Sequence, residues 1–425
     1  MSGNGGGATE RAVEAVWRIE SARLIGGLVR LVRDVGLAED LAQSAFVAAM
    51  ERWPETGIPD NPGAWLMATA KHRGIDELRR RRSLGQKHDS VDDRASELLA
   101  ESLDLESALD ETVGDDVLRL MLIACHPVLS REARVALALR LLGGLTTDEI
   151  ARAFFVSEAT IAQRIVRAKR TLFEARVPFE VPRGAELSAR LSSVLEAIYL
   201  IFNEGYAATR GDDWVRADLC EESLRLGRIL AQLAPEEGEV HGLVALMELQ
   251  SSRLPARVGP SGEPVLLLDQ DRSRWDQLLV HRGLAALERA EALAHPLGPY
   301  ALQAAIGACH ARAPTAAETD WLRIVALYDA LVELTGSPVI ELNRAVAVSM
   351  AFGPAAGLEI VDQLVDEPLL RTYHLLPAVR GDLLSRVGRH AEAVKELERA
   401  ASLAENTRER DLLLRRARAC KSPPS

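Results

Sequence analysis

Apolar residues recur at helical spacing along most of the chain, and long alternating runs typical of β-strands are absent. The segment 37–53, LAEDLAQSAFVAAMERW, carries one apolar stripe at i, i+4, i+7 and i+11, formed by Ala42, Phe46, Ala49 and Trp53. Another face of the same predicted helix carries Asp40, Gln43, Val47 and Glu51. The pattern by itself is that of an amphipathic helix with a solvated back.

A second helix is predicted within residues 58–82, where Asn61 and Pro62 form a typical N-cap and first-turn pair. We expect its buried stripe to consist of Ala64, Ala68, Ile75 and Leu78. Its C-terminal half is basic, with Lys71, Arg73, Arg79, Arg80, Arg81 and Arg82. Cations suit the C-terminus of a helix, but four consecutive arginines exceed what capping requires and favour a phosphate-binding face. Trp65 is expected in the core more readily than as a platform for stacked bases.

Residues 145–175 predict a helix-turn-helix. Thr146 and Glu149 have the spacing of a capping box, and Ser157 is placed to cap a second helix after a very short turn. The inward positions of the two helices are apolar: Ile150, Ala151, Phe154, Ile161, Ile165, Ala168 and Leu172. The outer side of the second helix carries polar and basic residues: Thr160, Gln163, Arg164, Arg167 and Arg170. Since Gln pairs with adenine and Arg with guanine in the major groove, we predict DNA binding here; the alternative is a helical hairpin with a charged face.

Charge is unevenly distributed along the chain, whose formal net charge is -11 from 51 Lys and Arg and 62 Asp and Glu. Residues 71–82 carry +4, residues 89–116 carry -10, and residues 158–176 carry +3. This balance excludes a basic coat for nucleic acid over the whole protein, but not a local basic helix. We interpret the acidic stretch as a solvated linker between two helical modules.

The predicted fold class is all-α, because aromatic residues make up only 4% of the chain while Ala and Leu, which are strong helix formers, are abundant. Two small helical domains, the second with the helix-turn-helix, are followed by an α-helical-repeat domain. Pro178 and Pro182 mark the boundary before this extension. The expected segments are a disordered tail at 1–9, a first module at 10–86, the acidic linker at 87–110, a second module at 111–176, a Pro-bounded linker at 177–183 and the extension at 184–425.

The extension shows one clear repeat unit. Residues 376–404 fit a tetratricopeptide, with small and apolar slots at Gly381, Leu384, Gly388, Ala393, Leu397 and Ala400. Residues 321–338 predict another packing helix, ended by Pro338. Residues 252–275 break the helical pattern with Pro and Gly, which predicts a long loop with a short strand at 265–268. Stacked helical repeats form concave surfaces that bind partners.

No constellation of residues indicates catalysis, a cofactor or a metal. The four cysteines, Cys125, Cys220, Cys309 and Cys420, are not clustered and are expected to be reduced thiols. Ala-Cys-His occurs at 124–126 and 308–310, but adjacent helical residues point about 100° apart and do not chelate a metal alone. Asp269 and Asp271 are interpreted as loop and cap residues. No apolar run is long enough for a membrane span, so we expect a cytoplasmic protein.

Together these motifs resemble a known family. Asp40, Leu41, Gln43 and Phe46 match the D-L-x-Q-x-x-F core of region 2.2 of sigma-70 factors. NPGAWLMATAKHRGIDELRRRR, residues 61–82, looks like regions 2.3 and 2.4, and residues 145–172 look like region 4.2. This abbreviated order is that of the extracytoplasmic-function (ECF) sigma factors. The segments 177–182, 199–206, 269–276 and 342–348 resemble the ECF subgroup that carries a long tetratricopeptide-like extension.

The resemblance implies a promoter-recognition subunit of RNA polymerase, which performs no bond chemistry. The helix at 37–53 would dock on the core polymerase (its β and β′ subunits), and the helix at 158–175 would read the -35 element of promoter DNA. The helix at 61–82 would hold the -10 element, with the candidate contacts Trp65, Lys71, Arg73, Arg79, Arg80, Arg81 and Arg82. The extension would modulate activity by binding a regulatory protein or a ligand. We expect its junction with the second module to involve residues within 199–206: Tyr199, Phe202, Asn203, Glu204 and Tyr206.

Other functions are less complete accounts of the chain. A stand-alone helix-turn-helix regulator with a repeat-type sensor domain would explain residues 145–175, but would leave the helices at 37–53 and 61–82 without a role. A repeat-based scaffold would treat the basic helices as solvated faces. An enzyme housed in the extension lacks catalytic residues. Only the first function requires a complex with core polymerase.

Overall fold

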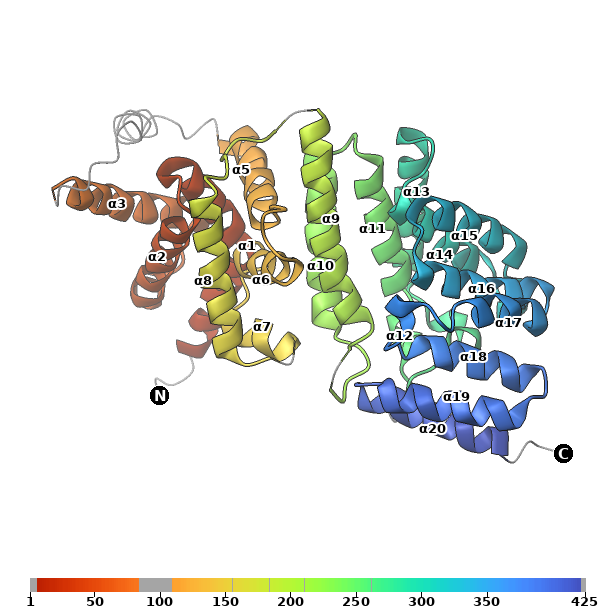
Figure 1. Ribbon diagram of the computed structural model, residues 1–425. Helices are drawn as coiled ribbons and strands as arrows, with labels where there is room; N and C mark the ends of the chain where they lie inside the picture. The colour runs from red at the N-terminus through yellow and green to blue at the C-terminus, as the bar shows by residue number, and fades with distance from the viewer. Residues whose placement is uncertain are drawn as a thin grey trace. The chain divides into compact units, whose positions relative to one another are not determined.

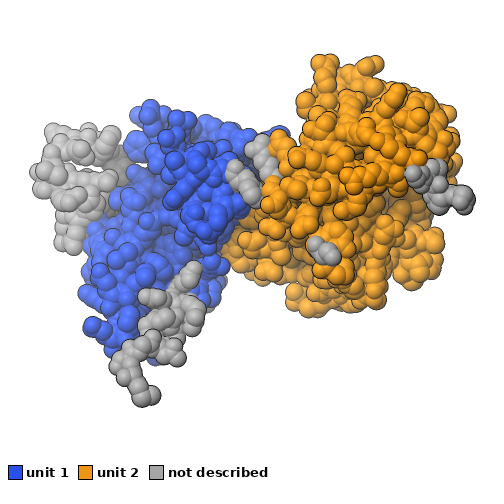
Figure 2. Space-filling view, turned by 90° about the horizontal axis from the view of Figure 1, so that it is seen from below, with its two compact units in different colours: residues 1–198 blue, residues 199–425 orange. Residues whose placement is uncertain are grey.

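The computed structural model describes residues 6–83, 109–154, 156–182, 184–209, 211–260 and 262–421. These residues form α-helices, short 3-10 turns and two isolated β-bridges, with no strand among them, and the all-α prediction is confirmed (Figure 1). The described chain divides into two compact units, residues 1–198 and 199–425 (Figure 2). No helix in the described parts of the chain is long and apolar enough to cross a membrane.

The first unit contains both predicted modules. Its helices are α1 (Gly6–Val32), α2 (Val35–Thr56), α3 (Pro62–Ser83), α5 (Leu109–Ala124), α6 (Arg131–Leu141), α7 (Thr147–Ala153), α8 (Glu158–Glu174) and the first part of α9 (Ala185–Tyr206). The expected acidic linker falls largely outside the described residues. The expected boundary at 177–183 separates α8 from α9, whereas the two compact units divide at residue 198, within α9.

Helix α1 holds the first unit together, because it packs against α2, α3, α5 and α6. Its inner face is fully buried and consists of Leu24, Ile25, Leu28 and Val29. At Gly26 a Cβ atom would lie 2.7 Å from the carbonyl oxygen of Asp116 on α5, so only glycine permits this close approach. Helix α1 of the first module therefore packs directly against α5 of the second.

The expected buried stripe of α3 is wrong at two positions. Ala64 and Ala68 are exposed, and the buried side of the helix instead carries Leu66, Ala70 and Gly74. Alanine removes little apolar area from water and fits either face of a helix, whereas Leu66 defines the face that must be buried. The side chains of Ile75 and Leu78 lie outside the described residues.

The second unit is a helical array in which successive helices pack against one another. It continues α9 with α10 (Ala217–Leu233), α11 (Gly238–Ser251), α12 (Leu254–Arg257), α13 (Gln277–Leu293), α14 (Pro299–Arg312), α15 (Trp321–Thr335), α16 (Pro338–Phe352), α17 (Pro354–Gln363), α18 (Leu375–Arg386), α19 (His390–Leu403) and α20 (Thr407–Lys421). The predicted tetratricopeptide unit corresponds to α18 and α19. A Cβ atom on Gly381 would lie 2.8 Å from Cγ of Leu397, which explains the small slot.

Two expectations for this unit are wrong. Helix α15 ends at Thr335 and is capped by Gly336, which adopts the left-handed conformation at φ 58°, and Pro338 is the first residue of α16. The strand expected at 265–268 does not form: Leu267–Asp269 is a 3-10 turn, and the bridge in this loop joins Val258 to Pro264. Proline has no N–H for a ladder, and no second strand lies beside this segment among the described residues.

The array closes on itself through Asn406, which is 1% exposed and lies between α19 and α20. Its Nδ2 donates to the carbonyl oxygens of Ala208 at 3.1 Å and Asp213 at 2.9 Å. Its Oδ1 accepts hydrogen bonds from the backbone N–H groups of Arg408 and Glu409. One side chain thus joins the loop after α9 to the start of the last helix, about 200 residues later.

Candidate nucleic-acid interface

Helix α8 is fixed in the first unit by its caps and its inner face. Ser157 caps the helix by accepting a hydrogen bond from the N–H of Thr160, and Thr146 and Glu149 form the capping box of α7, so both predicted caps are confirmed. The inner face of α8 is buried, as expected, and consists of Ile161, Ile165, Ala168 and Leu172. This anchoring leaves the opposite face of a 17-residue helix free to meet a ligand.

The outer face of α8 presents the predicted polar and basic residues to solvent. Gln163 and Arg167 are exposed and Arg164 is half-buried. Thr160 is exposed, and its hydroxyl lies 2.7 Å from that of Ser157. Arg170 is exposed too, but it forms an ion pair with Glu174 at 2.7 Å. Arg164 and Arg167, which form no ion pair with a described residue, lie near the middle of the helix.

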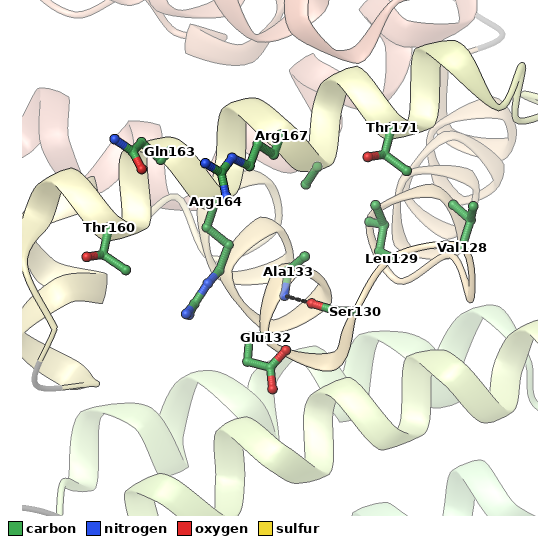
Figure 3. A pocket seen from close by; sticks show the side chains of 11 residues that line it. Val128, Leu129, Ser130, Glu132, Ala133, Thr160, Gln163, Arg164, Arg167 and Thr171 are labelled. Carbon is green, nitrogen blue, oxygen red and sulfur yellow. Dashed lines mark hydrogen bonds between the residues drawn. The ribbon is translucent and has the colours of Figure 1, made fainter.

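An open groove of about 460 Å³ runs along this face, between α8 and the start of α6 (Figure 3). Thr160, Gln163, Arg164 and Arg167 line it from α8. The other side is lined by Val128, Leu129, Ser130, Glu132 and Ala133. Arg170 does not line the groove. Arg164 extends towards Glu132, which the sequence analysis did not consider (Figure 3). Hydrogen bonds from its own backbone N–H and from Ser130, together with nearby arginines including Arg164, lower the pKa of Glu132.

The -10 candidates are distributed around α3. Trp65 is half-buried and packs edge-on against Trp53, with ring centroids 5.4 Å apart. Burial and the neighbouring Arg30 lower the pKa of Lys71. Arg73 is exposed and donates to the carbonyl of Ser44 on α2. Arg79, Arg80, Arg81 and Arg82 belong to α3, but their side chains lie outside the described residues.

The docking candidates on α2 fall into two groups. Leu41 is buried and Phe46 packs on Trp17, with ring centroids 4.8 Å apart, so these two residues position the helix. Asp40 is exposed and Gln43 is half-buried. Two large apolar residues are also exposed on this side: Val47 at 51% and Met50 at 45%. The sequence analysis missed Met50, although its spacing from Gln43 and Val47 places all three on one face.

A buried carboxylate joins α2 to the second module. Glu39, whose side chain is 4% exposed, accepts a hydrogen bond from Nε of Arg140 on α6 at 2.7 Å. It also forms an ion pair with Lys169 on α8, and Oε1 accepts from the amide of Gln43 at 2.6 Å. Arg18 on α1 adds a pair with Glu149 on α7 at 3.1 Å. The DNA-reading candidate α8 is thus held directly against the docking candidate α2.

The expected junction residues at 199–206 make their contacts within the second unit. The hydroxyl of Tyr199 donates to Gln303 at 3.1 Å, and buried Phe202 stacks on Tyr206. Glu204 pairs with Arg216 at 2.6 Å, and Asn203 is exposed. These contacts agree with the packing role that the aromatic residues would have in any helical array.

Helix α9 contacts the second module through a residue that the sequence analysis missed. Glu196 pairs with Arg131 at 2.6 Å and with the buried Arg134 at 2.8 Å, both on α6. Arg131 and Arg134 flank the groove residues Glu132 and Ala133. The only sequence signal would have been a carboxylate on the helix that follows the Pro-bounded linker.

The cysteines are structural in this fold. Cys125, Cys220 and Cys309 are buried and Cys420 is half-buried, all as free thiols. Burial raises the pKa of Cys125 to about 12, and burial, with a smaller effect of Arg190, lowers the pKa of His126 to about 4. Within the described ranges no group of three or more His, Cys, Asp or Glu side chains is arranged to hold a metal ion. Asp271 caps a 3-10 turn by accepting from Ser273.

Comparison with known families divides the chain in the same order as the helices. Residues 19–84 match Sigma-70 region 2, and residues 119–172 match Sigma-70, region 4. Residues 190–291 match a family of unknown function, DUF6596. No solved structure matches the chain significantly.

Relatives cover different parts of the chain. The uncharacterized protein R00370 of Rhizobium meliloti is 44% identical over 91% of this chain and 90% of its own length. The probable ECF RNA polymerase sigma factor SigI of Mycobacterium tuberculosis is 30% identical over 40% of this chain and 57% of its own. The ECF RNA polymerase sigma factor SigK of Mycobacterium ulcerans is 29% identical over 35% of this chain and 78% of its own.

The helix-turn-helix, the preceding module and these matches together define the class as a factor of the sigma-70 type, which acts in transcription initiation. The chain belongs to the ECF subfamily of RNA polymerase sigma factors and carries a helical C-terminal extension. Membership implies interaction with core polymerase and with promoter DNA.

Replacing Glu39 by Gln should loosen the second module from α2, because Arg140 and Lys169 would lose their shared carboxylate. Breaking a buried ion pair costs about 3 kcal/mol or more. We expect faster amide hydrogen exchange in α6 and α8 of the full chain. Asp40→Asn, a change at the neighbouring exposed carboxylate, is the control and should leave the exchange unchanged. Equal exchange in both variants would show that Glu39 does not hold the modules together.

Proposed function

We propose that the chain directs core RNA polymerase to specific promoters by reading the -35 element with α8, and that its extension modulates this activity. The carrying observation is the groove face of α8, where Gln163, Arg164 and Arg167 project from a helix fixed by a cap and a buried stripe. Recognition helices meet the major groove with their first turns, where Gln and Arg pair bidentately with bases.

The carboxylate of Glu132 lies in the groove and can interact with the groove arginines in place of DNA. Arg164 is close enough to lower the pKa of Glu132, so this carboxylate attracts the guanidinium and repels phosphate in the absence of DNA. On DNA binding Arg164 would exchange this neighbour for a base edge. The arrangement favours base contacts over phosphate contacts at this position.

The remaining sigma functions are assigned to α2 and α3. The outer face of α2 combines Asp40 with exposed Val47 and Met50, a mixture that suits a protein partner better than a phosphate backbone. The C-terminal half of α3, with its four consecutive arginines, is proposed to hold the -10 element through phosphates. In this function the protein binds and positions, and bond chemistry belongs to the polymerase.

Modulation by the extension is proposed to act through α9. Glu196 lies on α9 in the first unit, and its partners Arg131 and Arg134 hold the start of α6, which lines the groove. The same helix continues to Tyr206 in the second unit, where Glu204 and Tyr206 make internal contacts. A change in the extension that moves α9 would thereby alter the wall of the groove. In this proposal the segment 199–206 moves with the extension, and the movement changes the contacts of Glu196 with Arg131 and Arg134.

Gln163→Ala and Arg164→Ala should weaken transcription from the matched promoter and relax preference at one or two -35 base pairs, since each base contact contributes about 1–3 kcal/mol. The measurement is in vitro transcription with core polymerase on a set of single-base -35 variants. Arg23→Ala, at an exposed arginine on α1, is the control and should retain the full preference. A uniform loss over all -35 variants would make these residues phosphate contacts instead.

Asp40→Ala combined with Val47→Ala should lower affinity for core polymerase by about tenfold, because both side chains are exposed on α2 and neither contributes to its buried face. Co-purification and titration with core polymerase measure the effect, and Glu55→Ala at the end of the same helix is the control. A chain that binds promoter DNA specifically yet never binds polymerase would be a stand-alone regulator, and the proposed function would be wrong.

Glu196→Gln should change promoter activity without unfolding the chain, because Arg134, 11% exposed in its side chain, would lose its carboxylate beside the groove. We expect lower -35-dependent transcription together with faster amide exchange at the start of α6. Glu186→Gln, on an exposed position of the same helix, is the matched control. Unchanged transcription in both variants would remove the proposed route from the extension to the groove.

A further inference from the structure

Three arginines gather in the second unit without an acidic partner. Arg253 lies before α12, Arg257 ends it, and Arg272 lies in the 3-10 turn Arg272–Arg274. No carboxylate of the described residues lies within ion-pairing distance of any of them, although 62 acidic residues occur in the chain. Glu318 acts on Arg272 only from a longer distance. Burying like charges together is unfavourable unless an opposite charge compensates them.

Aromatic side chains form the walls of this arginine cluster. The guanidinium carbon of Arg257 lies 3.7 Å from the ring centroid of Tyr206 and 5.6 Å from that of Trp214. Trp275 lies between the other two arginines, 5.9 Å from Arg253 and 5.2 Å from Arg272. Guanidinium groups stack on such rings, which fixes their planes and leaves their edges to donate hydrogen bonds.

The cluster contains several buried donors and few acceptors. Five N–H groups have no hydrogen-bond partner in the structure: Nε of Arg253, Arg257 and Arg272, and Nε1 of Trp214 and Trp275. Buried polar groups of folded proteins are nearly always satisfied, so a set of unpaired donors in one place calls for an acceptor. The arginines also affect a neighbouring histidine. Burial is the main reason that the pKa of His310 is lowered to about 3, and the positive charges of Arg253 and Arg272 lower it further.

The three arginines have different degrees of freedom. Arg272 is committed to the fold, since it donates to the carbonyls of His310 and Ala313 and to the hydroxyl of Thr319. Arg253 donates through one nitrogen, Nη2, to Tyr206 and Gln250, and Arg257 donates through Nη2 to the carbonyl of Tyr206. Two guanidinium groups with further donors thus lie beside the same tyrosine. Their combined charge matches a phosphate dianion better than a single carboxylate.

We infer that Arg253 and Arg257, with Tyr206, Trp214 and Trp275, form a binding site for the phosphate group of a small molecule in the extension. All five residues fall within 190–291, the range that matches a family of unknown function. A small ligand fits better than a polypeptide, because the unpaired Nε atoms are buried and only a group that enters the cluster reaches them. Asn406 binds the carbonyls of Ala208 and Asp213, and Asp213 directly precedes Trp214, so an occupied site would reinforce this link between the two ends of the array.

The test uses the full chain and inorganic phosphate, so it does not depend on polymerase or promoter activity. Titration with phosphate should give saturable quenching or enhancement of tryptophan fluorescence and slower amide exchange at 206–214 and 250–275. Sodium chloride at matched ionic strength should give neither, and acetate distinguishes a carboxylate site from a phosphate site. Arg253→Gln and Arg257→Gln should each weaken the response about tenfold or more, while Arg289→Gln, an exposed arginine on α13, should preserve it.

Other results would overturn the inference. An absent response, an equal response to chloride, or protection of amides outside the cluster would each exclude a phosphate site here. A stronger response to acetate than to phosphate would reassign the ligand class. Arg257→Lys retains the charge but not the paired donors, so it should still fold and bind more weakly; unaltered binding in this variant would show that Arg257 does not contact the ion. If the glutamine variants unfold, the exchange footprint of the unaltered chain decides.

Discussion

The carboxylate of Glu39 is the buried polar contact that joins the two sigma modules in the first unit. It is buried on α2 and is shared by Arg140 on α6 and Lys169 on α8. Apolar packing around α1 buries most of the surface between the helices, but apolar contacts are not directional. A buried carboxylate, in contrast, accepts hydrogen bonds only from donors that lie at the right distance and angle. Glu39 therefore adds direction to the apolar packing that sets the position of α8 relative to α2, and α8 forms one wall of the groove.

The sequence predicts features that depend on neighbouring residues, such as helix caps and buried stripes. It does not predict contacts between residues that are far apart in the chain. The caps at Thr146 and Ser157 and the buried stripe of α8 depend on neighbours within a few turns, so their spacing was sufficient. Ala64 and Ala68 were misplaced because alanine carries little information about burial. Glu39 meets Arg140 across 101 positions and Asn406 meets Ala208 across 198, and no periodicity relates such residues. The arginine cluster likewise joins separate segments: 199–206 and the loop 252–275 stood out in the sequence, but nothing in either segment indicated that they meet around Tyr206 and Trp275.

Two charge clusters among the described residues, one around Glu39 and one around Arg253 and Arg257, differ in how their charge is compensated. Glu39 has two cations beside it, so its charge is compensated inside the protein and the cluster serves to hold helices together. Arg253 and Arg257 have aromatic rings and a like-charged neighbour instead of a carboxylate. Stacking on a ring offsets part of the cost of burial but neutralises no charge. The charge of Glu39 is balanced within the protein, so this cluster is a structural contact. The charges of Arg253 and Arg257 are balanced only when an anion from outside the chain binds, and this difference separates a structural ion pair from the proposed binding site.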